Sequence, residues 1–156
     1  MLRAHLICLL GLLFWLCGCK VSPPSRLERK VVVAAEHDIT VGNRAQKNPL
    51  PLTKETLAAG KEAYSHYCVV CHGLDGQATG VPFADRMAPP IPSLASKEVQ
   101  LYTDGQLKWV IDNGIWPSGM PGSKGTLSDD EVWSIVVYLR NLPPAGSQGT
   151  PEMYTH

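Results

Sequence analysis

The chain has 156 residues, and its 14 Lys plus Arg balance its 14 Asp plus Glu, so the formal net charge at pH 7 is zero. This length allows one ordinary domain with additional segments, and the balanced charge argues against a nucleic-acid-binding protein. Apolar residues make up 44% of the chain and are densest at the N-terminus. We therefore expect one small domain preceded by an export segment.

The first residues have the pattern of a secretory signal. Arg3 supplies a positive charge, and residues 6–16 form an apolar run shorter than the about 20 residues of a membrane-spanning helix. Residues 16–19 (LCGC) resemble the cleavage box of bacterial lipoproteins, which implies that residues 1–18 are removed and that Cys19 is lipidated. The alternative is an uncleaved N-terminal anchor. The lipoprotein interpretation places the domain on the periplasmic face of a bacterial membrane.

Residues 19–52 are expected to form a lipid-anchored linker. Within this linker, residues 31–33 (VVV) form either a short strand laid on the domain or part of a tether. We expect His37 to be a solvated side chain without a functional role.

A first helix is predicted over residues 54–66, with Thr53 as its N-cap. Its apolar face includes Leu57 and Tyr64, so His66 near the end of the helix is expected on the surface. The helix leads directly into the cysteine motif that carries the chemistry.

Two of the five cysteines lie in the predicted signal and Cys19 is the predicted lipidation site, so Cys68 and Cys71 remain. With His72 they form C-x-x-C-H, the signature of covalent haem attachment. Residues i and i+3 of a helical turn share one face, so both sulfurs can reach the two vinyl groups of one porphyrin. The next residue, His72, can then offer its imidazole to the iron as an axial ligand.

Three other interpretations compete for the motif. A thiol–disulfide oxidoreductase would place C-x-x-C at a helix start after a strand, whereas here an amphipathic helix precedes it. A structural zinc site would need two further ligands, and there is no second cysteine pair. A buried disulfide would leave the neighbouring residues unexplained.

The second axial ligand is predicted to be Met120. It lies in residues 116–122 (WPSGMPG), a stretch of turn residues that can lay a thioether against iron. A core gap-filler is the ordinary alternative for such a side chain. Met87 is the second choice, and Met153 lies in the C-terminal tail.

A second helix is predicted over residues 104–113, where Thr103 and Gln106 form a capping box and Gly114 follows as a C-cap. A third is predicted over residues 129–141, beginning with a second capping box. The residues that define this third helix are the box pair Ser128 and Glu131, the apolar face Val132, Ile135, Val136 and Leu139, and the terminating Pro143 and Pro144. Residues 144–156 are expected to be a flexible tail.

These landmarks together resemble a class I c-type cytochrome over residues 53–142. The resemblance implies an all-α cytochrome c domain over residues 53–143, with three main helices around one covalently attached haem c. In this family the first and last helices cross closely near the haem. Gly60 and Tyr64 match the crossing positions of the first helix, and the matching contacts on the last helix are Ile135, Tyr138 and Leu139.

The resemblance also extends to the Pro-rich loop of residues 88–94 (APPIPSL). It implies that the carbonyl of Pro92 accepts the Nδ1–H of His72, and that Leu94 packs on the porphyrin. Ser93 departs from the acidic or amide residue that the family often has before this leucine.

The function implied by the resemblance is electron transfer between redox proteins in or at the membrane, with no catalytic residues, small-molecule substrate or nucleic acid. A haem enzyme or sensor with an open sixth iron position is the alternative, and a thiol–disulfide enzyme is a third class. A subunit of a larger respiratory complex is compatible with the electron carrier.

Overall fold

The computed structural model describes residue 27 and residues 45–87, 89–115 and 118–155. The predicted signal, the lipidation site at Cys19 and His37 lie outside these residues. The chain divides into two compact units, Met1–Val31 and Val32–His156, and every feature below belongs to the second.

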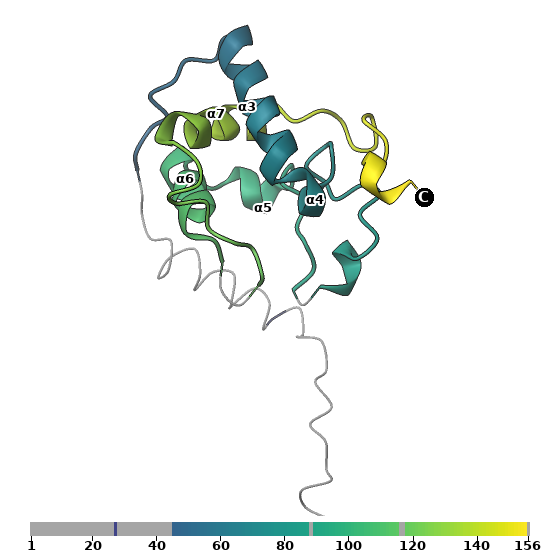
Figure 1. Cartoon of the computed structure of the whole chain (residues 1–156). Coiled ribbons are helices and arrows are strands. Elements are labelled where there is room, and N and C mark those ends of the chain that lie inside the picture. Colours follow the sequence, from purple (N-terminus) through teal and green to yellow (C-terminus); the bar gives the residue numbers. More distant parts are fainter. Residues whose placement is uncertain (1–26, 28–44, 88, 116–117, 156) are drawn as a thin grey trace, which may run out of the picture. The chain divides into compact units, whose positions relative to one another are not determined.

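Helices are the regular elements of the described residues, which contain two isolated β-bridges and no strand. The all-α fold is confirmed. The elements are α3 (Lys54–Tyr67), α4 (Val69–His72), η2 (Ala84–Arg86), α5 (Lys97–Gln100), α6 (Asp104–Asn113), α7 (Asp129–Leu139) and η3 (Glu152–Tyr154) (Figure 1). The three long helices are the three predicted ones, with α7 ending two residues before the predicted end at residue 141. The short elements η2, α5 and η3 were not predicted, whereas α4 is the helical turn expected of the cysteine motif.

The predicted caps hold the ends of α6 and α7. The amide of Gln106 donates to Thr103 Oγ1 at 3.1 Å, and the Gln106 side chain accepts from the Thr103 amide at 2.8 Å. Ser128 and Glu131 make the same reciprocal pair, at 3.3 and 2.8 Å. These bonds satisfy amides that have no partner inside the helix, so they fix where each helix begins.

The closest helix crossing brings α3 against α7 at Gly60. A Cβ atom at this position would lie 2.0 Å from the carbonyl oxygen of Ser134, so only glycine fits. One turn later the rings of Tyr64 and Tyr138 pack with centroids 5.1 Å apart and an interplanar angle of 55°. The crossing positions Gly60, Tyr64 and Tyr138 predicted from the sequence are therefore confirmed, and Ser134 is a contact that was not predicted.

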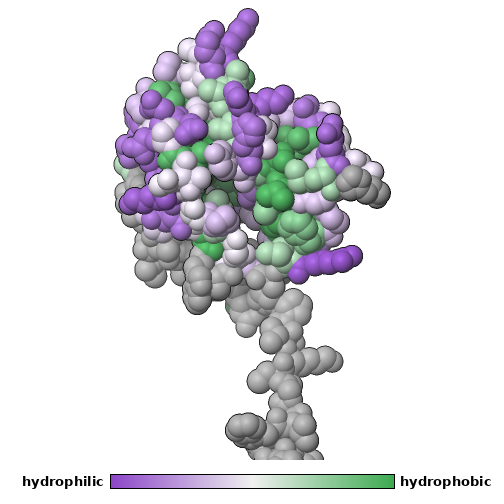
Figure 2. Space-filling model, in the orientation of Figure 1, coloured by the Kyte–Doolittle hydropathy of each residue, from purple (hydrophilic) through white to green (hydrophobic). Residues whose placement is uncertain are grey.

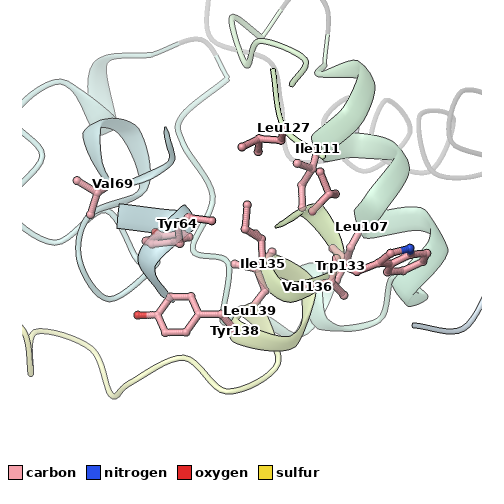
Figure 3. Packing of buried hydrophobic residues seen from close by; sticks show 12 residues of the cluster. Tyr64, Val69, Leu107, Ile111, Leu127, Trp133, Ile135, Val136, Tyr138 and Leu139 are labelled. Atoms are coloured by element: carbon pink, nitrogen blue, oxygen red, sulfur yellow. The ribbon is translucent and has the colours of Figure 1, made fainter. Parts of the chain in front are cut away.

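The hydrophobic core lies where α3 and α6 pack on α7 (Figure 3). Every residue from Val132 to Leu139 is buried, because α7 is covered on several sides. Leu107 and Ile111 of α6 point into the same cluster as Ile135 and Val136. This core sets the position of α3, and so of the cysteine motif at its end.

Part of the predicted linker packs against the domain. The side-chain amide of Asn48 donates to the carbonyl of Trp133 at 2.8 Å, and the carbonyl of Gln46 accepts from the Gly105 amide at 2.9 Å. Leu50 packs against the core cluster. The packed chain thus extends beyond the predicted boundary at residue 53.

The C-terminal tail, which the sequence predicts to be flexible, makes defined contacts over residues 146–155. Pro151 is fully buried, and the amide of Gly146 donates to Asp75 Oδ2 at 2.7 Å. These contacts join the tail to the loop that follows α4. A sequence pattern does not reveal them, because the partners are far apart in the chain.

Candidate functional site

The C-x-x-C-H motif occupies a single helical turn that continues from α3. Cys68 ends α3, where its amide donates to the Tyr64 carbonyl at 2.9 Å, and it also begins α4. Its own carbonyl accepts from the amides of Cys71 and His72, at 3.1 and 2.9 Å. Cys68 and Cys71 therefore lie one turn apart, as the haem interpretation requires. Both thiols are half-buried and unpaired.

His72 ends α4 as a half-buried neutral imidazole. Partial burial lowers its pKa to about 4, so at neutral pH the ring carries a lone pair that a metal can accept. Its Nδ1 atom is buried and has no hydrogen-bond partner among the described residues. Buried polar atoms are normally satisfied, so such a ring fits a residue that binds a group outside the polypeptide.

The bond expected between Pro92 and His72 is not formed. Nδ1 of His72 has no hydrogen-bond partner in the part of the chain that the structure describes, and Pro92 is exposed. The Pro-rich loop is held instead by the amide of Leu94, which donates to the Gly76 carbonyl at 2.7 Å. Leu94 is half-buried and packs against the core cluster.

The Cys68 thiol does not have the character of the attacking group of a disulfide-exchange site. Burial, together with the neighbouring Cys71, raises the pKa of the Cys68 thiol to about 12. A thiol–disulfide oxidoreductase attacks with a thiolate, which needs a lowered pKa. This electrostatic environment argues against that alternative.

Met120 lies in the loop between α6 and α7. The loop turns back on itself, so that the Ile115 amide donates to the Met120 carbonyl at 3.1 Å. Gly114 permits this approach, since a Cβ there would lie 2.4 Å from the Met120 oxygen. Met120 is half-buried.

Met87 lies beside the same loop. Its methyl carbon is 3.5 Å from the position that a Cβ of Gly119 would take. Met87 is half-buried, whereas Met153 in the tail is 49% exposed. The two strongest sequence candidates for the second ligand are thus brought together, and the third is on the surface.

The surface is hollowed between the side formed by α5 and α6 and the side formed by α4 and η2 (Figure 2). Hydrophobic side chains gather along this hollow in the view shown. Such an apolar surface suits a flat hydrophobic ligand.

A separate open cavity of about 580 Å³ lies along α3 and the start of α7. Four carboxylates and His66 are among its lining residues, but none of the predicted haem ligands is. His66 is exposed, as expected. The described residues contain no cluster of His, Cys, Asp and Glu that could hold a metal ion by itself.

Asp75, three residues after His72, was not singled out from the sequence. It is fully buried and accepts hydrogen bonds from the Gln77 amide, the Thr79 hydroxyl and the Gly146 amide. The signal that could have identified it is Asp75-Gly76-Gln77, a pattern typical of an Asx turn. Its partner in the tail could not have been read from the sequence.

Comparison with known families gives one match over more than half of the chain. The family described as "Cytochrome C oxidase, cbb3-type, subunit III" matches residues 55–139, which span α3 to α7 and include the C-x-x-C-H turn. No described helix has both the length and the apolar character needed to cross a bilayer.

Three curated relatives align with the same region. The cytochrome c subunit of a quinone alcohol dehydrogenase from Gluconobacter oxydans is 38% identical over 92 residues, covering 53% of this chain and 18% of the relative. Quinohemoprotein alcohol dehydrogenase ADH IIB from Pseudomonas putida is 29% identical over 98 residues, with coverage of 62% and 13%. Thiosulfate dehydrogenase from Stutzerimonas stutzeri is 30% identical over 98 residues, with coverage of 60% and 29%.

The chain spans less than a third of the length of each of these relatives. The alignment is therefore a likeness between domains rather than between whole proteins. Because the family match runs across the long helices and the cysteine turn alike, this chain belongs to the cytochrome c family of cbb3-type oxidase subunit III.

Proposed function

We propose that this protein is an electron carrier with one haem c, attached through Cys68 and Cys71 and ligated by His72 and Met120. The observation that carries the proposal is the neutral His72, whose buried Nδ1 atom has no partner among the described residues, on the same turn as two free thiols. Family membership supports the haem, and the C-x-x-C-H spacing supports its covalent attachment.

Each residue of the turn has a separate task. Cys68 and Cys71 supply the two sulfurs, one turn apart, that hold the porphyrin by thioether bonds. His72 offers a neutral imidazole, so no proton has to leave the ring at neutral pH. The haem, when bound, supplies an iron that alternates between ferric and ferrous states.

Met120 supports a carrier rather than an enzyme. A carrier needs both axial positions filled, and a thioether ligand keeps the potential high. Gly114 and Gly119, which both precede Met120 in the chain, adopt φ values of 71° and 85° and shape the turn that leads into Met120. A haem enzyme or sensor would leave this axial position open.

The partners are proposed to be redox proteins in or at a membrane. The relatives include a cytochrome c subunit of a dehydrogenase and two proteins named as dehydrogenases, which supports a domain that works beside an oxidoreductase. The lipoprotein-type signal and Cys19 support a periplasmic protein held to the membrane by lipid. This protein is then a tethered carrier or an electron-entry subunit of a respiratory complex.

A redox titration with carbon monoxide separates the two haem functions. The purified protein should show one reversible one-electron transition, and its reduced form should not bind carbon monoxide, because Met120 and His72 fill both axial positions. Rapid binding of carbon monoxide by the reduced native protein would replace the carrier with an enzyme or sensor.

A further inference from the structure

Three backbone carbonyls of the haem-attachment turn and its exit each accept a hydrogen bond from a tyrosine hydroxyl. Each tyrosine belongs to a different element: α3, α7 and the C-terminal tail. The pairs are Tyr64 to Gly73 at 2.8 Å, Tyr138 to Leu74 at 3.4 Å, and Tyr154 to Val70 at 2.6 Å. We call these three tyrosines the carbonyl clamp.

The carbonyl clamp supplies hydrogen-bond donors to backbone carbonyls that have no partner within α4. α4 is only four residues long, and the last carbonyls of a helix have no partner within it. The Val69 carbonyl accepts from the Gly73 amide at 2.9 Å, which leaves the Val70 carbonyl to a partner from elsewhere. Tyr154, 84 residues along the chain, is that partner.

Tyr64 and Tyr138 are fixed members of the clamp. Both rings are buried in the core and pack on each other. Burial raises the pKa of each hydroxyl, so both keep their protons and donate at neutral pH. They hold the exit of the turn, at Gly73 and Leu74, against the helices.

Tyr154 is fixed through the tail. Its ring packs edge-on against Phe83, with centroids 6.2 Å apart. Upstream, Thr150 covers Gly80 so closely that a Cβ there would lie 2.4 Å from the Thr150 hydroxyl oxygen. The tail is therefore packed against the domain, and this packing fixes the position of the Tyr154 hydroxyl beside the turn.

We propose that Tyr154 is a positioning residue for the haem site, holding the carbonyl of Val70 and with it the turn that carries Cys68, Cys71 and His72. This inference rests on the proposed function, since the positioned group is the iron ligand. When the bond is removed, the turn loses one of three fixed points, and His72 is held less firmly toward the iron.

The test compares two Tyr→Phe variants of the full-length haem-loaded protein. Tyr154→Phe removes the clamp hydroxyl and keeps the ring against Phe83. Tyr67→Phe is the matched control, because Tyr67 lies on neighbouring α3, is 50% exposed and is not a member of the carbonyl clamp. Amide hydrogen exchange over residues 69–74 measures the turn, and the midpoint potential with the far-red sulfur–iron band measures the haem.

The expected result for Tyr154→Phe is exchange about fivefold faster over residues 69–74, from the loss of one hydrogen bond, with a midpoint potential that differs from the parent's. Tyr67→Phe should match the parent in both measurements. Faster exchange with an unchanged potential would overturn the positioning role, and so would unchanged exchange. A parent protein without covalent haem would instead overturn the proposed function. The haem content of the parent is measured first, so this outcome is distinguished from a failure of the positioning role.

Discussion

At the scale of single residues, the two methionines at the α6–α7 loop are the candidates for the proposed second iron ligand. Met120 is held in that loop by a backbone bond to Ile115, whereas Met87 approaches it through its methyl group at Gly119. Met120 has the better-fixed backbone. We therefore propose Met120 as the ligand and Met87 as a packing residue.

Met120→Ala should open the sixth iron position while leaving the haem attached, because attachment depends on Cys68 and Cys71. The ferric variant should lose the weak far-red band of sulfur-bound haem, and the reduced variant should bind carbon monoxide. Met87→Leu is the control and should keep the band. If Met120→Ala keeps the band and Met87→Leu loses it, the ligand assignment is reversed.

Gly60→Ala sets two effects of opposite sign against each other. Alanine favours a helix over glycine by about 1 kcal/mol, but here its Cβ would lie 2.0 Å from the Ser134 carbonyl oxygen. Overpacking typically costs about 1–3 kcal/mol, and a rigid backbone partner puts this site at the upper end. We expect a net loss of about 2 kcal/mol in urea unfolding. Ala58→Ser, at an exposed position of α3, is the control and should change the free energy of unfolding little. A Gly60→Ala protein more stable than the parent would refute the close crossing of α3 and α7.

At the scale of elements, Asp75 joins the loop after α4 to the tail. Burial alone would raise the pKa of Asp75, but hydrogen bonds from Thr79, Gly146 and Gln77 outweigh it and hold the pKa below its ordinary value. The unfolded state, with the higher pKa, therefore takes up the proton first as the pH falls. The stabilisation is complete above the unfolded pKa, near 4, and is lost as the pH falls through the folded pKa.

Asp75→Asn should remove this pH dependence and destabilise the domain by about 2 kcal/mol at neutral pH, because the amide cannot accept all three donors. Urea unfolding between about pH 7 and about pH 3 measures both effects. Asp85→Asn changes an exposed carboxyl and serves as the control. An Asp75→Asn protein whose stability falls with acid as steeply as the parent's would contradict this role.

The long helices could be predicted because their signals are local. Thr103 with Gln106 and Ser128 with Glu131 lie three residues apart, and the same pairs form the capping boxes of α6 and α7. The C-x-x-C-H turn is equally local. Such features need no knowledge of the rest of the fold.

The contacts that escaped prediction join distant parts of the chain. Asn48 bonds to Trp133 across 85 residues, and Gly146 bonds to Asp75 across 71. The position of residues 144–156 at the end of the chain led us to expect a flexible tail, but position in the sequence does not show that a residue such as Pro151 is buried. The expected hydrogen bond between Pro92 and His72 is not formed. The Pro-rich loop is held by the bond from the Leu94 amide to the Gly76 carbonyl, which the sequence did not predict.

At the scale of the whole molecule, the attachment to the membrane is proposed to depend on Cys19. Cys19→Ser should release the protein from membranes or block its maturation, because lipid and not a spanning helix would hold it. Fractionation of cell envelopes followed by a carbonate wash measures this. A Cys19→Ser protein that is still cleaved and stays with the washed membrane would contradict the lipoprotein assignment.

The central claim is that one haem is covalently bound at Cys68 and Cys71 and makes this chain an electron carrier. The most direct measurement is the intact mass of the denatured protein from a host that matures c-type cytochromes. We predict the mass of the polypeptide plus one haem, and the mass of the polypeptide alone for the Cys68→Ser/Cys71→Ser variant. A native protein that has the polypeptide mass alone, or loses its haem to acid-acetone extraction, would contradict the account.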